Sequence, residues 1–159
     1  MGDDKASSPR PMANIINAAS EGNLAVTMTP EDFVYIDRDC EYFKGVMRQI
    51  QRIMAEVSDQ KHWGLGEDNA PMVSARTLVD RFKTKARGAN DGNSVWELME
   101  QHYRIVEDIQ TVHRTIRERM MQADSDWAAD FNYKNETLPD RPPAQLPAGP
   151  YLLPDGTGR

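Results

Sequence analysis

The sequence contains one cysteine, Cys40, among 159 residues, which excludes an internal disulfide and a metal centre built from several thiolates. Aromatic residues make up only 8% of the chain, too few for the thick core of a sheet-and-helix protein. No run approaches the ~20 apolar residues that cross a bilayer. The start, Met1-Gly2-Asp3-Asp4-Lys5, lacks the basic and apolar segments of a signal peptide. We therefore expect synthesis in the cytoplasm, without direct membrane insertion.

Positive charge is also scarce, because 25 acidic side chains against 19 basic ones give a formal net charge of −6. Such a chain repels a phosphate backbone unless its basic residues gather on one face, so nucleic acid is not the expected partner. One basic cluster stands out, with only Asp80 opposing it nearby and Phe82 as its single aromatic residue. It comprises Arg76, Arg81, Lys83, Lys85 and Arg87. We interpret it as a complement to acidic side chains of a neighbouring helix or of an acidic partner.

What the sequence does contain suits helices. Nine methionines stand against four phenylalanines, and methionine is an unbranched helix former that fills irregular gaps. No segment shows the alternation of a convincing strand. The composition therefore predicts an all-α protein in which helices pack on helices.

The first strong helix signal is Thr29-Pro30-Glu31-Asp32, which supplies an N-cap, a proline at the first helical position and acidic residues in the first turn. The apolar residues that follow recur in steps of three and four, the spacing of a coiled-coil seam, and Val46 and Ile53 widen it. The seam consists of Phe33, Ile36, Cys40, Phe43, Met47, Ile50, Met54 and Val57. We predict a helix with a broad buried face, ending between Ser58 and Lys61.

Two further helical patterns form the returning arm. The first spans residues 72–86, and the glycine-containing segment 88–92 interrupts it. The second opens with Ser94 and Glu97, spaced as a capping box, and continues to Phe131 as one helix of about 35 residues. The predicted fold is thus an elongated antiparallel helical hairpin with a broken second arm.

The ends of the chain differ from this hairpin domain, which covers residues 29–132. Residues 1–28 show no lasting period and are predicted to form a flexible N-terminal arm. Six prolines follow residue 138 and cannot sustain a helix, so residues 133–159 are predicted to be a disordered, proline-rich tail.

No catalytic or metal-binding signature accompanies these helices. His102 and His113 lie about three helical turns apart, roughly 16 Å, which is too far to share one metal ion. No nucleophile has an evident base beside it. We therefore predict a protein that is not an enzyme and has no cofactor and no metal site.

The arrangement resembles the WXG family of type VII secretion substrates and their longer actinobacterial relatives. Trp63-Gly64-Leu65-Gly66 takes the place of the family's Trp-x-Gly turn between two helical arms. Tyr103 and Glu107 match its Tyr-x-x-x-Asp/Glu secretion signal, with both side chains on adjacent turns of one helix face. The same pattern also occurs at Tyr35 with Asp39 and at Tyr151 with Asp155.

The resemblance implies a helical partner in a homo- or heterodimer, recognition by a type VII secretion ATPase, and export without a signal peptide. The main alternative is a cytosolic helical adaptor or chaperone for a larger secreted toxin. A helical enzyme with an unrecognised site is a third class.

The long third pattern carries two neighbouring apolar stripes, and one opposing helix covers only one of them. Part of the second stripe is therefore predicted to stay exposed and to form the partner interface, giving a four-helix arrangement with the partner. It consists of Met99, Val106, His113, Met120 and Trp127.

Overall fold

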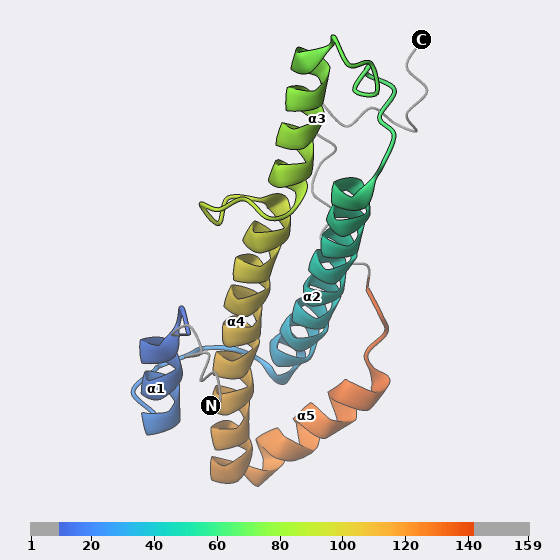
Figure 1. The fold of residues 1–159 in the computed structure, drawn as a ribbon. Helices are drawn as coiled ribbons and strands as arrows, with labels where there is room; N and C mark the ends of the chain where they lie inside the picture. The colour runs from blue at the N-terminus through green and yellow to red at the C-terminus, as the bar shows by residue number, and fades with distance from the viewer. Residues whose placement is uncertain (1–9, 142–159) are drawn as a thin grey trace, which may run out of the picture.

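The computed structural model describes residues 10–141, which form five α-helices and, within that range, no strand. The helices are α1 (Ala13–Glu21), α2 (Pro30–Asp59), α3 (Val73–Ala86), α4 (Val95–Ala123) and α5 (Ser125–Thr137). In Figure 1, α2 and α4 run antiparallel, side by side, and α3 extends the line of α4 beyond a loop. The predicted all-α hairpin with a broken second arm is confirmed. Within residues 10–141, no helix has the length and apolar character needed to cross a membrane.

Both long helices begin at the capping boxes predicted from the sequence. The Asp32 N–H donates to Thr29 Oγ1 at 3.2 Å, and the Thr29 N–H donates to Asp32 Oδ2 at 2.9 Å. Ser94 and Glu97 repeat this exchange at the start of α4, at 3.3 Å and 3.2 Å. Each box satisfies backbone N–H groups that have no acceptor within the helix, so short local patterns suffice to define these two starts.

The N-terminal segment requires a correction, because it contains a packed helix. The nine residues of α1 lie against α4, and Ala19 is only 1% exposed. The Met12 N–H donates to Asp108 Oδ2 at 3.0 Å, while the Arg119 guanidinium donates to the Ser20 carbonyl at the other end of α1. These contacts place a negative group at the helix N-terminus and a positive one at its C-terminus. The prediction of a flexible arm fails from residue 10 onward because α4 supplies the stability that so short a helix lacks alone.

The expected helix of about 35 residues also differs, because it divides at Asp124. This residue is extended (φ −141°, ψ 111°), so α4 ends before it. Its carboxylate accepts the N–H groups of Asp126 at 2.9 Å and Trp127 at 3.0 Å, and this N-cap starts α5 in a new direction. Figure 1 shows α5 crossing toward α2 at the foot of the hairpin.

Helix α5 continues to Thr137, beyond the predicted boundary at residue 133. The residues after it are held by α2: Arg38 donates to the Leu138 carbonyl at 3.1 Å, and the Tyr35 hydroxyl donates to the Pro139 carbonyl at 3.3 Å. The start of the predicted disordered tail is therefore ordered as far as residue 141. Residues 1–9 and 142–159, to which the remaining predictions of disorder apply, lie outside the described residues.

The apolar core lies at the foot, where α1, α2, α4 and α5 meet. Phe33 is 2% exposed, and its ring makes an edge contact with Trp127 at a centroid distance of 5.7 Å. The buried members are Ala19, Phe33, Val34, Val112, Ile116 and Phe131. This part of the molecule supplies most of the hydrophobic stabilisation.

The middle of the hairpin is held by polar contacts between α2 and α4. Asp37 Oδ2 accepts Arg114 Nη2 at 3.0 Å, and Lys44 Nζ donates to Gln110 Oε1 at 2.8 Å. Nearer the tip, Gln51 donates to the Trp96 carbonyl at 3.1 Å. Burial by itself raises the pKa of Asp37, but hydrogen bonds and the charge of Arg114 outweigh it and hold that pKa below its usual range. Polar side chains therefore take the position that an apolar seam usually occupies.

Candidate protein-interaction site

The polar contact turns part of the apolar surface of α2 away from α4. Asp37, Lys44 and Gln51 recur every seven residues and face α4. At about 100° per residue, five apolar residues of α2 lie roughly 100–180° around the helix from this face. They are Phe43, Val46, Ile50, Ile53 and Val57, here called the outer stripe.

The outer stripe is accessible in the folded chain. Phe43 is 38% exposed and Ile53 is 44% exposed, and Tyr42 lies beside Phe43 with ring centroids 5.7 Å apart. Val46, Ile50 and Val57 are half-buried. Their steps of three and four form the seam onto which another helix packs. All five were predicted to belong to the broad buried face of the hairpin, so the structure places them on a different side from that expected.

The Trp63 turn stands at the end of the hairpin, directly after α2. Gly64 and Gly66 have φ values of 70° and 91°, the left-handed region that favours glycine. The Glu67 carboxylate accepts the backbone N–H groups of Trp63, Gly64 and Leu65. These hydrogen bonds, that from Trp63 first, lower the pKa of Glu67 to about 2. The turn is therefore held by its own acidic residue, and it presents the Trp63 ring toward α3.

An apolar hollow of about 310 Å³ opens beside this turn. Trp63 stacks on Phe82 of α3, with ring centroids 5.7 Å apart and planes 14° apart. The lining consists of Met54, Val57, Trp63, Phe82, Lys85, Ala86 and Val95, here called the tip hollow. Because Val57 belongs to both, the outer stripe leads into the tip hollow.

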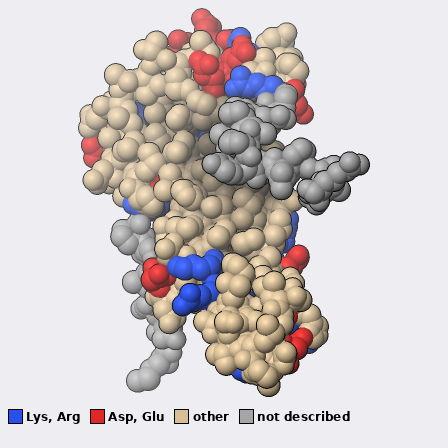
Figure 2. All heavy atoms as spheres, turned by 90° about the horizontal axis from the view of Figure 1, so that it is seen from above, with Lys and Arg blue, Asp and Glu red and all other residues tan. Residues whose placement is uncertain are grey.

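More large apolar side chains are exposed around the tip. Leu65, Met72 and Leu78 are each 44% exposed, and Val73 is 62% exposed. Figure 2 looks down on this end, where most of the described surface is uncharged and charged side chains gather in a few separate groups. Contiguous exposed apolar surface with a large aromatic residue at its centre is typical of protein interfaces.

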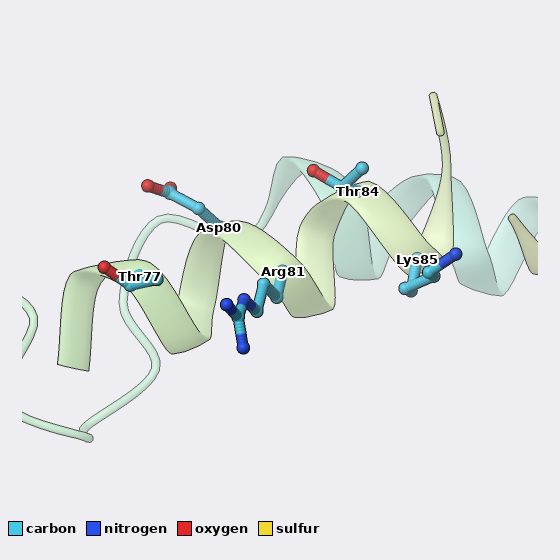
Figure 3. A pocket seen from close by; sticks show the side chains of 5 residues that line it. All are labelled: Thr77, Asp80, Arg81, Thr84 and Lys85. Atoms are coloured by element: carbon cyan, nitrogen blue, oxygen red, sulfur yellow. The ribbon is translucent and has the colours of Figure 1, made fainter. Parts of the chain in front are cut away.

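Basic residues of α3 border the tip. Lys85 lines the tip hollow and also a second hollow of about 440 Å³ on the outer side of α3. The outer hollow is lined by Thr77, Asp80, Arg81, Thr84 and Lys85. Figure 3 shows these side chains leaving one helix, with Arg81 pointing away from Asp80 and Thr84. Polar residues thus flank the apolar surface, as at the rim of many interfaces.

One group of side chains in the described range brings potential metal ligands together: His62, Glu67 and Asp68, with ligand atoms within 4.8 Å of one another. The turn accounts for this grouping. Glu67 already accepts three backbone N–H groups, and His62 Nδ1 lies 3.1 Å from Asp68 Oδ2 in an exposed pair. We therefore assign these residues to the conformation of the loop.

Tyr103 and Glu107, the candidate secretion signal, lie midway along the hairpin. The Arg48 guanidinium is 3.9 Å from the centre of the Tyr103 ring, and Lys44 Nζ is 5.9 Å from it. Tyr103 and Glu107 are both half-buried. Tyr103 therefore stabilises the α2–α4 contact through cation–π interactions.

The other two matches to the signal pattern fall elsewhere. Tyr35 is 7% exposed and lies beneath the guanidinium of Arg141, at 3.8 Å from the ring centre, while Asp39 pairs with the same arginine at 3.7 Å. Tyr151 and Asp155 lie outside the described residues.

The predicted partner stripe on the returning arm is largely covered by the chain itself. Its members Met99, Val106, His113, Met120 and Trp127 are all half-buried. Met120 and Trp127 pack against the core, and the His113 ring makes an edge contact with Phe33 at 6.2 Å. The stripe is less exposed than expected, because α1 and α5 supply covering surface that the hairpin by itself lacks. The accessible apolar seam is on α2.

The sequence holds no clear signal for this arrangement. On α2, residues 37, 44 and 51 are polar at heptad spacing, and on α4 Tyr103 and Gln110 repeat at the same interval. Polar residues at this spacing ordinarily mark the solvent-facing side of a helix, so the pattern by itself favours the opposite assignment. The apolar periodicity of α2 therefore does not indicate the outer stripe.

The buried position of His113 has a measurable consequence. Burial lowers the pKa of its imidazole below the usual 6.5, although the negative charge of Asp37 acts in the opposite direction. Its Nδ1 is buried and has no hydrogen-bond partner among residues 10–141. The folded protein therefore favours the neutral ring.

We expect the stability that depends on neutral His113 to decrease on acidification. The unfolded chain takes up the proton first, so this stability is complete above about pH 6.5 and is lost as the pH falls toward the lower folded pKa. The free energy of unfolding should decrease between pH 7 and 5, by at most about 1.4 kcal/mol per pH unit for one proton. Urea titrations of wild type and His113→Gln measure this. Parallel pH profiles for the two proteins would contradict the assignment.

Comparisons with protein-family models, curated proteins and solved structures found no match to this chain. The WXG resemblance therefore stays a resemblance of short sequence motifs. What the protein does has to be argued from its own surface, of which the outer stripe and the tip hollow are the most distinctive parts.

Proposed function

We propose that this chain is a non-enzymatic interaction protein that binds a second helical protein along the outer stripe and the tip hollow. The observation that carries the proposal is the spacing of Phe43, Val46, Ile50, Ile53 and Val57, which forms a helix-packing seam on the side of α2 away from α4. Packing a partner helix there removes large apolar groups from water. The product is a homo- or heterodimer with a four-helix arrangement.

Within this class, we propose a WXG-like type VII secretion substrate or secretion partner. The Trp63 turn supports this proposal because it joins the arms of the hairpin at its end. The half-buried position of Tyr103 in the α2–α4 contact favours a structural role for that residue over an exposed signal. The alternative, a cytosolic adaptor or chaperone for a larger secreted toxin, uses the same docking surface. Measuring the amount of this protein in culture filtrates, with and without depletion of the secretion ATPase, distinguishes the two. The amount falls on depletion only if the protein is exported by that system.

Replacing Val46 and Ile53 together with Glu tests the docking surface. Two charges in the middle of the seam should weaken partner binding at least about tenfold, because each carboxylate loses water on burial without an opposite charge. Both positions lie away from the α4 contact, so helical circular dichroism should stay unchanged. Co-purification followed by mass spectrometry identifies the partner, and titration calorimetry measures its affinity.

Gln122→Glu with Asn132→Asp is the matched control, because it adds the same two negative charges at exposed positions of α4 and α5 at the foot of the molecule, away from the outer stripe. It should leave binding close to that of wild type. A wild-type protein that is a stable monomer at micromolar concentration, with no co-purifying partner, would contradict the proposed function.

A further inference from the structure

We infer that the partner presents an acidic amphipathic helix, whose apolar side packs on the outer stripe and tip hollow and whose acidic side chains lie against Arg81 and Lys85 of α3. This inference rests on the proposed function and specifies the chemistry of the partner. It depends on the charge of α3, on the position of that charge beside the apolar surface, and on the pairing of the basic groups within the chain.

Charge sets α3 apart from the rest of the molecule. The whole chain has a net charge of −6, yet the segment 76–87 holds five basic residues and only Asp80 as an acidic one. A local positive field on an acidic protein attracts acidic partners to this end and repels further copies of the basic segment.

The basic residues lie next to the apolar surface. The inner side of α3 is buried through Ala75, Val79 and Ala86, which leaves Phe82 46% exposed at the edge of the tip hollow. Lys85 lines both the tip hollow and the outer hollow, and Arg81 lies one turn before it on the same side of α3, in the lining of the outer hollow. A helix seated in the hollow brings its flanking residues within reach of both.

Arg81 and Lys85 form few and weak ion pairs within the described part of the chain. Lys85 Nζ is 3.6 Å from an Asp91 carboxylate oxygen, and both side chains are more than half exposed, so the pair is weak. Arg81 makes no ion pair with any of residues 10–141. The charges therefore remain accessible to a partner.

Other occupants fit less well. Single-stranded nucleic acid stacks its bases on free aromatic faces, and Phe82 already stacks on Trp63. The net charge of −6 repels the phosphate backbone of any nucleic acid at long range. A second copy packed along the same stripe brings α2 flanks with mixed charge, including Arg52 and Glu56, so it offers no concentrated acidic edge. An acidic helix satisfies both the apolar seam and the basic rim.

Two designed helical peptides provide the probe. They share one apolar seam at steps of three and four, and they differ only in their flanking positions, which are Glu in one and Gln in the other. Fluorescence anisotropy of the labelled peptides with the full chain, in low-salt buffer, measures both affinities. We expect the Glu peptide to bind about tenfold tighter than the Gln peptide, from several exposed pairs acting together, and the difference to shrink at 0.5 M salt, where screening is strong.

Variants of the protein test which residues cause the preference for the Glu peptide over the Gln peptide. Arg81→Gln with Lys85→Gln should reduce the ratio between the two peptides to less than about twofold while leaving Gln-peptide affinity unchanged, because only the charged rim is removed. Arg104→Glu on α4 alters net charge by the same amount at an exposed position away from α3, and it should retain the tenfold ratio. Circular dichroism confirms that each variant is folded.

The outcomes separate this inference from the proposed function. Equal binding of both peptides by wild type overturns the acidic partner and leaves helix docking intact. Binding of neither peptide overturns the inference, and the co-purification experiment then decides the proposed function. A homodimer that Val46→Glu with Ile53→Glu dissociates also overturns the inference, since the occupant is then a second copy.

Discussion

Phe33→Ala should destabilise the fold by about 3–5 kcal/mol, the range for removing a large buried aromatic side chain. Phe33 is 2% exposed and lies where α2, α4 and α5 meet, in edge contact with His113 at 6.2 Å and Trp127 at 5.7 Å. Its removal leaves a cavity that the helices cannot all close at once. Urea or thermal unfolding monitored by circular dichroism measures the loss.

Phe43→Ala is the matched control, because it makes the same truncation on the same helix at a position that is 38% exposed. It should cost less than about 1.5 kcal/mol in the isolated chain, since much of the ring already contacts water. Equal effects of the two substitutions would show that the outer stripe is buried in solution. That result would remove the basis for a docking surface on α2.

The second large effect is expected at Asp108, which is 1% exposed. Its carboxylate accepts the Met12 N–H at 3.0 Å and lies 3.4 Å from Arg10 Nε, so one side chain fixes the beginning of α1. Asp108→Ala removes a charged acceptor from buried surface and should cost about 2–3 kcal/mol. The amides of α1 should lose protection from hydrogen exchange before those of α2 and α4, because its nine residues cannot remain helical alone.

Glu118→Ala serves as the comparison for Asp108, since Glu118 is on the same helix with its side chain 64% exposed in a weak 3.9 Å pair with Arg117. It should change the stability by less than about 0.5 kcal/mol. If exchange from α1 is unaltered in Asp108→Ala, the apolar contacts of Ala19 hold this helix and the buried carboxylate does not.

The features determined by the sequence alone are those whose physics is local. The capping boxes at Thr29 and Ser94 close within four residues, so their side chains define where α2 and α4 begin whatever packs on them. Gly64 and Gly66 define the Trp63 turn in an equally local way, because each glycine adopts its positive φ without a Cβ clash, whatever packs around it. The apolar periodicity likewise specified helices and an antiparallel hairpin.

Only the tertiary structure decided which side of each helix faces which neighbour. Helix α1 packs on α4 through contacts that include Asp108 and Arg119, about a hundred residues further along the chain, and no local pattern contains that information. The α2–α4 contact is made by several long-range pairs, among them Asp37 with Arg114 and Lys44 with Gln110, and these pairs leave the outer stripe on the opposite side of α2. An amphipathic pattern specifies that a face will be buried, whereas the choice of partner for that face depends on the combined energy of all helices packed together.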